Sequence, residues 1–302
     1  ESSWEKVPRL PAGHFVSGLV YTDPDVYQDE IDNIFSKAWR FACHESELPE
    51  PFDYRLVDHA GQSLICIRGE DDEVRTFLNV CSHRGGKLLT EPSGNARLIT
   101  CFYHRWTYDS LGACTGIPRP SGYSKEVAKD SMGLRGLRTA VKHGLVFIAL
   151  DEGAPDLDTF IGLALDQFSE MLGTTLLEVF HYNRAVLYCN WKAWHETNMD
   201  LYHEFMHAVL RQTQVGAMPM EDRRLITFEN GHGGSGGDLK AAYDGYKSFA
   251  GRGGDVPPLP GTDPTDFRFV DLFPSTAIIA RGTVVRIDTA TPLGPDKKIG
   301  RA

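Results

Sequence analysis

The chain has 302 residues, of which 41% are hydrophobic, and a formal net charge of −10 at neutral pH. This length suits one large domain or two ordinary ones, with enough apolar residues for a buried core. The acidic balance argues against a nucleic-acid-binding protein, because such a protein needs a basic face toward phosphate.

Neither a membrane segment nor a secretory signal is recognisable in the sequence. No run approaches the roughly 18 apolar residues that a membrane-spanning helix needs, and the opening ESSWEKVPRL has no apolar segment. The six cysteines are sparse, unlike those of a disulfide-rich secreted domain. We therefore expect a cytoplasmic protein that does not enter a membrane, in which paired Cys and His residues indicate a metal.

The first half of the chain predicts a helix followed by a β domain. Apolar residues at helical spacing predict a helix over residues 22–40, with Thr22 or Asp23 as its cap and Pro24 in its first turn. From about residue 52 to 150, short β-rich runs alternate with turn residues, which predicts a small antiparallel domain. These runs are YRLV, SLICIR, VRTFLNV, RLITCF, WTYD and LVFIAL.

After residue 150 the pattern becomes helical again. It predicts a helix over 157–172, a strand over 180–189 and one long helix over 191–211. Residues 230–264 are rich in Gly and Pro, which is typical of a flexible surface excursion or of a lid over a pocket. Strands return over 268–288, with a hairpin turn predicted at Arg281–Gly282.

Two Cys/His pairs carry the first chemical signal. They read C-x-H (Cys81, His83) and C-x-x-H (Cys101, His104), with seventeen residues between them. Two sulfurs and two nitrogens suit a [2Fe–2S] cluster in which histidines replace two cysteines on one iron. The same atoms suit tetrahedral zinc, so the ligand types alone leave both open. Gly85–Gly86 after the first pair favours the cluster, because glycines let backbone N–H groups approach bridging sulfides.

The run from CSHRGG to GACTGIP resembles the Rieske segment of the Rieske non-heme iron oxygenases, of the aromatic-ring-hydroxylating type. The similarity includes the spacing of the pairs, the R-G after the first and the W-x-Y after the second; AWRFACHESELPE resembles the family's entry into this domain. The resemblance implies that Cys81 and Cys101 hold one iron, and His83 and His104 the other. Cys114 lies outside both pairs, and we expect it in the core or in a strand.

A second candidate metal site follows in ETNMDLYHEFMH. His203 and His207 are four residues apart, so a helix projects both imidazoles from one face. Two histidines and a carboxylate form the facial triad of non-heme Fe(II) oxygenases. The resemblance implies that His203 and His207 bind the mononuclear iron. It also implies that Asp200 bridges His203 to His104 of the neighbouring subunit, which couples the cluster to the iron.

The third iron ligand, a carboxylate, stays unassigned. In the family it lies far downstream, and the sequence ends at Ala302, so we expect the C-terminal part of the catalytic domain to be incomplete. The aspartates that follow the two histidines without a recognisable ligand context are Asp263, Asp266, Asp271 and Asp288. Weaker expectations are Asn198 as a polar neighbour of the iron, Glu196 either near the iron ligands or facing solvent, His195 as a helix-surface residue, and Trp191 and Trp194 as core.

Together these features predict an α+β fold, in which an antiparallel β Rieske [2Fe–2S] domain (41–150) is inserted into a catalytic domain of helices and antiparallel sheet (1–40 and 151–302). The resemblance implies the terminal oxygenase component, the α subunit, of a multicomponent Rieske oxygenase. It would use NADH-derived electrons to activate O₂ at a mononuclear Fe²⁺ and hydroxylate an aromatic substrate, as a dioxygenase or monooxygenase of aromatic hydrocarbon catabolism.

The expected partners are a separate reductase, with or without a ferredoxin, and further subunits in a homotrimer or an α3β3 assembly with a small β subunit. No GxGxxG follows a strand, so we expect NADH to bind elsewhere. Two alternatives remain: a Rieske monooxygenase or demethylase acting on a carboxylate, sulfonate or amine, and a Rieske electron-transfer protein without catalysis.

Overall fold

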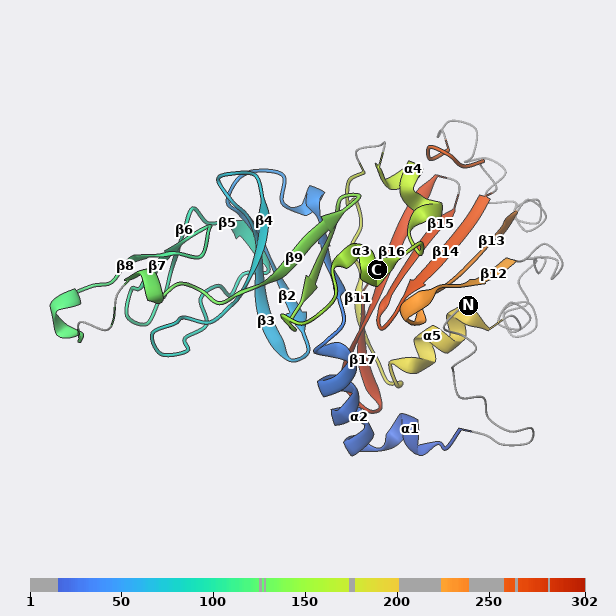
Figure 1. Cartoon of the computed structure of the whole chain (residues 1–302), viewed down its shortest axis with the longest axis horizontal. Coiled ribbons are helices and arrows are strands. Elements are labelled where there is room, and N and C mark those ends of the chain that lie inside the picture. Colours follow the sequence, from blue (N-terminus) through green and yellow to red (C-terminus); the bar gives the residue numbers. More distant parts are fainter. Residues whose placement is uncertain are drawn as a thin grey trace. The chain divides into compact units, whose positions relative to one another are not determined.

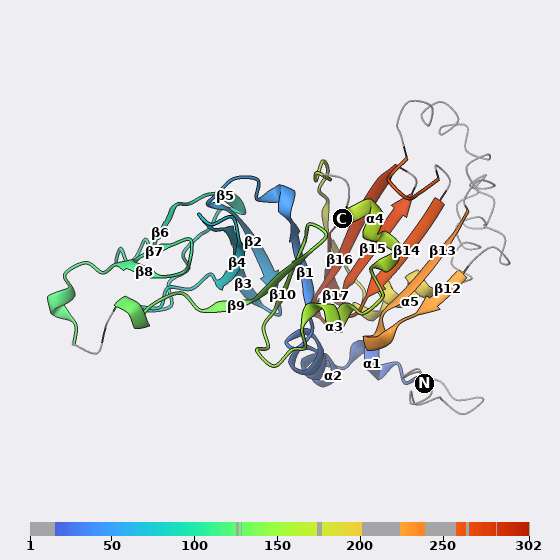
Figure 2. The ribbon, with the colours of Figure 1, turned by 45° about the horizontal axis from the view of Figure 1, so that its top comes forward.

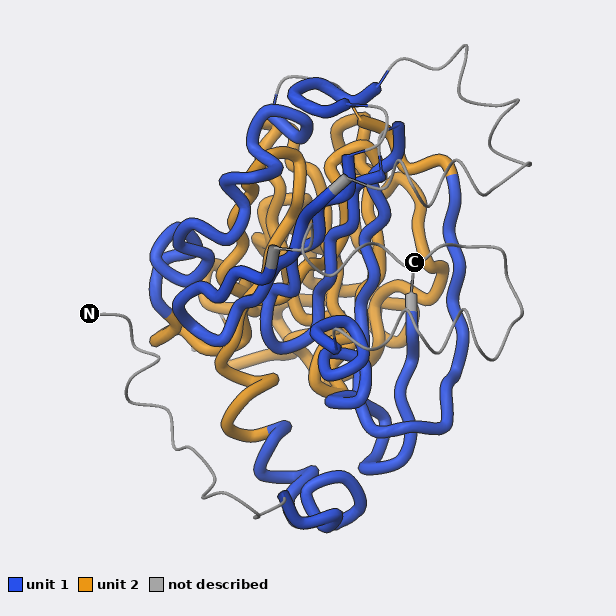
Figure 3. Tube along the Cα trace, turned by 90° about the vertical axis from the view of Figure 1, so that its right-hand side faces the viewer, with its two compact units in different colours: residues 1–31, 155–176, 181–302 blue, residues 32–154, 177–180 orange. Residues whose placement is uncertain are grey.

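The computed structural model of the chain describes residues 16–124, 127, 129–173, 177–200, 224–238, 258–263, 266–281 and 283–301. It divides into two compact units (Figure 3). Unit 1 comprises residues 1–31, 155–176 and 181–302, and unit 2 comprises residues 32–154 and 177–180. Unit 2 therefore interrupts unit 1 in the sequence, and the mixture of helices with antiparallel sheets confirms the α+β prediction.

Unit 2 contains a seven-stranded antiparallel sheet in the order β1-β10-β9-β4-β3-β2-β5 and a three-stranded sheet β6-β7-β8 (Figure 1). The strands are β1 (Arg40–His44), β2 (Asp53–His59), β3 (Gln62–Arg68), β4 (Val74–Leu78), β5 (Ser93–Asn95), β6 (Leu98–Thr100), β7 (Thr107–Asp109), β8 (Cys114–Gly116), β9 (Gly136–Lys142) and β10 (Leu145–Ala149). Short 3₁₀ helices lie at Glu45–Glu47, Pro120–Gly122 and Lys129–Ser131. All six predicted β-rich runs are confirmed as strands, and Cys114 begins a strand in the core, as expected.

The predicted helix over 22–40 is wrong in its extent. The structure has α1 (Leu19–Thr22), α2 (Pro24–Glu30) and a π turn at Ile31–Phe35, before β1 begins at Arg40. Asp23 is extended and its carboxylate accepts a hydrogen bond from the Asp25 N–H at 2.8 Å, so it caps α2 as predicted. The same extended residue ends α1 and divides the helix.

Unit 1 is built on a second seven-stranded antiparallel sheet, in the order β11-β17-β16-β15-β14-β13-β12 (Figures 1 and 2). Its strands are β11 (Arg184–Leu187), β12 (Arg224–Thr227), β13 (Gly233–Asp238), β14 (Asp266–Leu272), β15 (Thr276–Arg281), β16 (Val284–Gly294) and β17 (Lys297–Arg301). Besides α1 and α2, the described part of unit 1 contains the helices α3 (Leu157–Ile161), α4 (Ser169–Gly173) and α5 (Lys192–Met199), with 3₁₀ helices at Asp166–Phe168 and Glu229–Gly231. The predicted hairpin is confirmed between the end of β15 and the start of β16.

The Gly-rich run is partly strand, which corrects the expectation of a surface excursion. A Cβ added at Gly233 would lie 2.8 Å from the Met199 side chain of α5, on one face of the sheet. One added at Gly234, on the other face, would lie 3.3 Å from the Gln167 side chain. At Gly233 and Gly234, β13 is therefore enclosed between two layers that leave little room for a side chain. Residues 239–257 lie outside the described part of the chain.

Two predicted helices are not continuous. The helix over 157–172 breaks at Gly162, whose φ of 53° ends α3. Within the predicted helix over 191–211, α5 ends at Met199, because Asp200 takes an extended conformation (φ −80°, ψ 116°); residues 201–211 lie outside the described part of the chain. Among the described residues, no helix has the length and apolar character needed to cross a membrane.

Candidate functional site

The first Cys/His pair lies on a tight loop that follows β4. The Cys81 N–H donates to the Gly86 carbonyl at 2.8 Å, and the Gly85 N–H donates to the Cys81 carbonyl at 2.9 Å. Gly85 has a φ of 69°, the left-handed conformation that glycine adopts without cost. The loop closes on itself, and the ligand side chains project from its turn.

The second pair repeats this loop between β6 and β7. The Cys101 N–H donates to the Trp106 carbonyl at 2.8 Å, and the Arg105 N–H donates to the Cys101 carbonyl at 3.0 Å. Arg105 occupies the left-handed position here, with a φ of 62°. The two loops therefore share one backbone design although C-x-H and C-x-x-H differ in sequence.

The four candidate ligands come together at these loops. Cys81 and Cys101 are free thiols with 3% and 2% of their surface exposed, and the rings of His83 and His104 lie 4.7 Å apart in an edge contact. Within the described part of the chain, His83 Nδ1 is buried without a hydrogen-bond partner. Gly86 leaves space beside Cys101, since a Cβ there would lie 3.4 Å from its Sγ. Buried thiols, an unpaired ring nitrogen and a glycine cradle fit a [2Fe–2S] cluster.

A single zinc ion and a two-iron cluster place different demands on the four side chains. Tetrahedral zinc draws three or four ligands onto one position. Among the described residues, no group of three or more His, Cys, Asp or Glu side chains is placed to do so. A two-iron cluster separates its protein ligands into two pairs, which matches two cysteines on one iron and two histidines on the other.

Aromatic residues that the sequence interpretation did not single out support the histidines. His83 stacks on Trp106 with centroids 4.7 Å apart and planes 6° apart, and it meets Tyr123 edge-on at 5.7 Å. The Trp106 indole N–H donates to the Tyr123 hydroxyl at 3.3 Å. Desolvation, with the His104 and Arg84 charges, lowers the pKa of His83, which favours the neutral, metal-binding imidazole.

Tyr108 contacts the sulfur of a candidate ligand. Its hydroxyl lies 3.1 Å from Cys81 Sγ and accepts the Ser82 N–H at 3.1 Å. Burial, and then the interaction with Cys81, raises the pKa of Tyr108, so the phenol keeps its proton. Because Ser82 donates to the oxygen, the phenolic hydrogen is free to point toward Sγ. The W-x-Y alternation could have revealed this, since period two places Trp106 and Tyr108 on one face of a strand.

The second candidate site is described only at its beginning. His203 and His207 lie outside the described residues. Asp200 is exposed and directly follows the last helical residue of α5, so the prediction of one continuous helix through Asp200 is wrong. The structure therefore brings the four cluster candidates together, and it gives Asp200 as the first residue beyond α5.

The N-terminal segment fastens the start of α5. Glu30 accepts hydrogen bonds from Trp191 Nε1 at 2.7 Å and from Lys192 Nζ at 2.6 Å. The Tyr21 hydroxyl donates to Glu196 Oε1 at 2.6 Å, which gives this exposed carboxylate a partner in α1. Trp191 is buried, as expected for a core residue.

Side chains further along α5 contact the sheet. The prediction of His195 as a helix-surface residue is wrong: its side chain is half-buried, with Nδ1 2.5 Å from Asp271 Oδ2 and Nε2 against the Pro274 carbonyl. The Lys298 ammonium lies 4.6 Å from the centre of the Trp194 ring. Among the described residues, Asn198 Nδ2 is buried without a hydrogen-bond partner.

Comparison with known proteins agrees with the metal chemistry of these loops. Residues 38–132 match the family model of the Rieske [2Fe–2S] domain. The fold resembles a solved naphthalene 1,2-dioxygenase (TM-score 0.78, 24% identity, 94% of this chain and 69% of that one). It also resembles a quaternary ammonium Rieske monooxygenase (TM-score 0.76, 24% identity, 94% of this chain and 73% of that one).

The relatives found by sequence are more similar to this chain than the two solved structures are. The chain is 44% identical to the α subunit of 2-aminobenzenesulfonate 2,3-dioxygenase from an Alcaligenes species, over 97% of this chain and 75% of that protein. It is 39% identical to the hydroxylase α subunit of methanesulfonate monooxygenase from Methylosulfonomonas methylovora, over 98% and 73%. The chain therefore belongs to the Rieske oxygenases as an α subunit, the terminal oxygenase component, in a family defined by a [2Fe–2S] cluster and a mononuclear iron that are supplied with electrons by a reductase or ferredoxin.

Proposed function

We propose that Cys81 and Cys101 hold one iron of the cluster and that His83 and His104 hold the other. The paired loops carry this proposal, because they bury two free thiols and hold the two imidazoles in contact. Unit 2 then serves as the Rieske domain, for which the sequence predicts residues 41–150, and unit 1 serves as the catalytic domain. When bound, the cluster stores one electron at a time and the mononuclear iron activates O₂.

His203 and His207 are the proposed protein ligands of the mononuclear iron, with a third carboxylate still unassigned. Asp200 is proposed to accept N–H from His203 and from His104 of a neighbouring subunit. A carboxylate between two imidazoles fixes their tautomers and links the two sites. Its place directly after α5, a helix fastened by Glu30 and Asp271, supports a defined direction for this carboxylate.

The proposed substrate is a small aromatic acid, with an aryl sulfonate as the first candidate. The support comes from the names of relatives: 2-aminobenzenesulfonate 2,3-dioxygenase at 44% identity, and anthranilate 1,2-dioxygenase from Acinetobacter baylyi at 33% identity, of which the chain spans about half. Both names combine an aromatic ring, an acid group and an amino group. Ring dihydroxylation is the reaction proposed for this substrate.

A second candidate is monooxygenation of an alkyl sulfonate. It is favoured by the 39% identity to methanesulfonate monooxygenase across nearly the whole chain. The sulfonate is common to the two first relatives, whereas the ring is not. A sulfonate is therefore the shared feature of both proposals.

The proposed assembly is a trimer of α subunits, alone or with small β subunits. A route from His104 of one subunit to Asp200 of the next requires at least two copies, which supports an oligomer. The proposed location is the cytoplasm, supported by six cysteines that are all free thiols, as a reducing compartment keeps them.

Product analysis tests the proposal. The purified oxygenase, with a reductase and NADH, is incubated under ¹⁸O₂ with 2-aminobenzenesulfonate, anthranilate, benzenesulfonate and methanesulfonate. We expect two ¹⁸O atoms in a ring diol from an aryl sulfonate. Release of sulfite and formaldehyde from methanesulfonate favours the second candidate, and the absence of any oxidised product from every compound overturns both.

Two variants assign the sites in the same assay. Cys81→Ser removes a cluster ligand, so the cluster EPR signal should be lost. His203→Ala should keep that signal and lose product formation by several orders of magnitude. Labelled product from His203→Ala at the wild-type rate contradicts the iron assignment.

A further inference from the structure

The side chain of His195 connects α5 to the sheet of unit 1. Its Nδ1 lies 2.5 Å from Asp271 Oδ2, near the end of β14, and its Nε2 contacts the carbonyl oxygen of Pro274 in the turn that follows. His195 and Asp271 are largely buried, with 15% and 5% of their side-chain surfaces exposed. The ring also lies edge-on to Trp191 at 5.6 Å.

Both ring nitrogens of His195 face oxygen atoms that can only accept. A neutral imidazole has one N–H donor and one lone pair, so it satisfies only one of them. The other nitrogen would then direct its lone pair at an oxygen. The doubly protonated imidazolium donates to both, and the Asp271 carboxylate balances its charge.

A second histidine shows the opposite arrangement in the same region. His232 Nδ1 accepts the Phe273 N–H at 3.0 Å, and His232 Nε2 donates to the Phe160 carbonyl at 2.8 Å. This set of one donor and one acceptor suits a neutral ring, and desolvation lowers the pKa of His232. His232 therefore holds the β14–β15 turn through Phe273 and Phe160, whereas His195 holds the same turn to α5.

His195 lies between the two ends of α5, so its contact with Asp271 bears on how the helix is held. The helix has only eight residues, and its start is fixed by Glu30 through Trp191 and Lys192. Its last residue, Met199, packs in the cluster of Phe269, Ala277 and Ile279 on the same face as Asp271. Between these two ends, His195 supplies a polar contact with the sheet, and the backbone leaves the helix at Asp200, five residues later.

We propose that His195 is a positioning residue: as an imidazolium paired with Asp271, it fixes the rotation and height of α5 and thereby the direction of the Asp200 carboxylate. This inference rests on the proposed relay through Asp200. It predicts that loss of the pair slows electron delivery while both metal sites remain assembled. It also predicts that electron delivery depends on the His195–Asp271 pair and not on the other contacts of the β14–β15 turn.

Single-turnover reoxidation of the reduced cluster tests this in the assembled oxygenase. The protein is mixed with O₂ and 2-aminobenzenesulfonate, or with the panel compound that wild type oxidises fastest, and the visible absorbance of the cluster is followed. His195→Gln and Asp271→Asn should each slow reoxidation about tenfold or more, because small misplacements cost large factors in rate. Iron content, the cluster EPR signal and the cluster potential should stay at wild-type values.

Two further variants separate positioning from general damage. His195→Gln combined with Asp271→Asn restores an uncharged hydrogen-bonding pair, so it should recover most of the rate that either single variant loses. His232→Gln alters the same turn but leaves the His195–Asp271 pair in place, so this variant should reoxidise its cluster at the wild-type rate. Wild-type rates in both single variants overturn the inference, as does an equal loss in His232→Gln.

Asp200→Asn, measured alongside, distinguishes this inference from the proposed function. A wild-type rate in Asp200→Asn overturns the relay itself. A slow Asp200→Asn together with wild-type rates in the His195 and Asp271 variants overturns only the positioning role.

Discussion

The hydroxyl of Tyr108 is placed to influence the reduction potential of the cluster through the proposed ligand Cys81. Its hydroxyl accepts from Ser82 N–H and lies 3.1 Å from Cys81 Sγ, so its hydrogen is available to the sulfur. A hydrogen bond to sulfur favours the reduced cluster, which carries more negative charge. Tyr108 is therefore placed to raise the reduction potential.

Replacing Tyr108 by Phe tests this directly. If the hydrogen bond is stronger by about 1 kcal/mol in the reduced state, its loss lowers the one-electron potential by roughly 40 mV. Redox titration of the cluster EPR signal measures the shift. An unchanged potential in Tyr108→Phe, with the cluster intact, contradicts the role of this hydroxyl.

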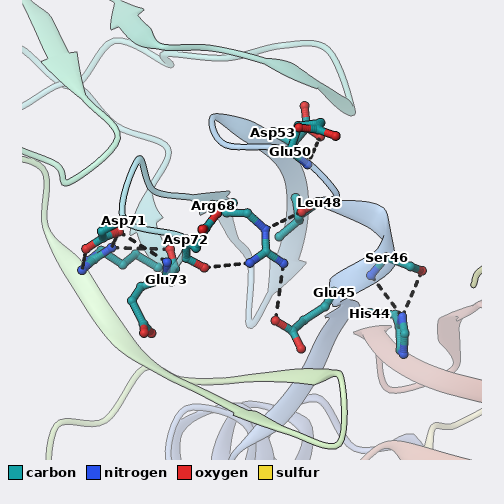
Figure 4. A network of polar contacts seen from close by, with 11 residues as sticks. His44, Glu45, Ser46, Leu48, Glu50, Asp53, Arg68, Asp71, Asp72 and Glu73 are labelled. Carbon is teal, nitrogen blue, oxygen red and sulfur yellow. Dashed lines mark hydrogen bonds and ion pairs between the residues drawn. The ribbon is translucent and has the colours of Figure 1, made fainter. Parts of the chain in front are cut away.

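His44 makes the stability of unit 2 dependent on pH. The ring Nδ1 of His44 accepts the backbone N–H of Ser46 at 3.1 Å, and the backbone N–H of His44 donates to the Glu47 carboxylate. Together these two hydrogen bonds form a capping box (Figure 4 shows His44 with Ser46). Desolvation lowers the pKa of His44 and outweighs the opposing charges of Glu47 and Glu45. The neutral ring is the one that caps.

The sign follows from the depressed pKa. The unfolded chain binds the proton more readily, so the stabilisation is fully present above the ordinary histidine pKa of about 6.5 and is lost as pH falls below it. We expect a lower melting temperature at pH 5 than at pH 7.5. His44→Asn keeps a capping acceptor that does not titrate and should show a smaller drop, whereas His44→Ala should cost about 1 kcal/mol at pH 7.5. The same pH dependence in His44→Asn as in wild type refutes this role.

At the scale of elements, the two cluster loops use one backbone design with different residues. Gly85 and Arg105 occupy the same left-handed position, with φ of 69° and 62°. Glycine adopts this conformation without cost, whereas another residue costs about 1 kcal/mol. The loop of Arg105 therefore holds strain that the loop of Gly85 does not.

Exchange of these residues tests the shared design. A Cβ at Gly85 meets nothing within 4 Å, so Gly85→Ala should lower the free energy of unfolding by about 1 kcal/mol through backbone strain alone. Arg105→Gly removes strain and should be tolerated. Urea unfolding, followed by loss of the visible cluster absorbance, compares them; equal midpoints for wild type and Gly85→Ala would falsify the argument.

The sequence predicts these elements best where local patterns decide them. Alternating apolar runs and turn residues identify the strands that flank both loops, and C-x-H with C-x-x-H predicts four candidate ligands, which the structure brings together. Local patterns predict the wrong structure where contacts with segments distant in the sequence determine it. Residues 233–238 look like a loop, yet they form a strand because they pair with β12 and β14. The glycines at 233 and 234 leave space for Met199 and Gln167, which approach from opposite faces.

The same limit explains His195 and the end of α5. From the sequence alone, His195 looks like a surface residue. Its partner Asp271 lies 76 residues away in the sequence, so no local pattern reveals the contact. Helical spacing continues through Asp200, so the sequence cannot show that the backbone becomes extended there. The period-two pattern of a strand could have predicted that Trp106 and Tyr108 lie on the same face, beside the candidate ligands.

At the scale of the whole molecule, the chain contains two chemically distinct units. Unit 2 presents the proposed cluster ligands on loops of an antiparallel domain, and unit 1 fixes α5, which ends shortly before the proposed iron ligands. A Rieske oxygenase needs both, since electrons stored at one site are used at the other. The proposed route from His104 to Asp200 of the neighbouring subunit joins the two units across copies of the chain.

Mixed oligomers test this route most directly. Cys81→Ser subunits lack the cluster and His203→Ala subunits lack the mononuclear iron, so each variant alone should be inactive. When the two are co-expressed and the mixed oligomers are purified, each functional cluster can lie beside a functional iron in its neighbour. The account predicts that product formation from the panel substrate returns to a substantial fraction of the wild-type rate. Mixed oligomers as inactive as the separate variants would contradict it.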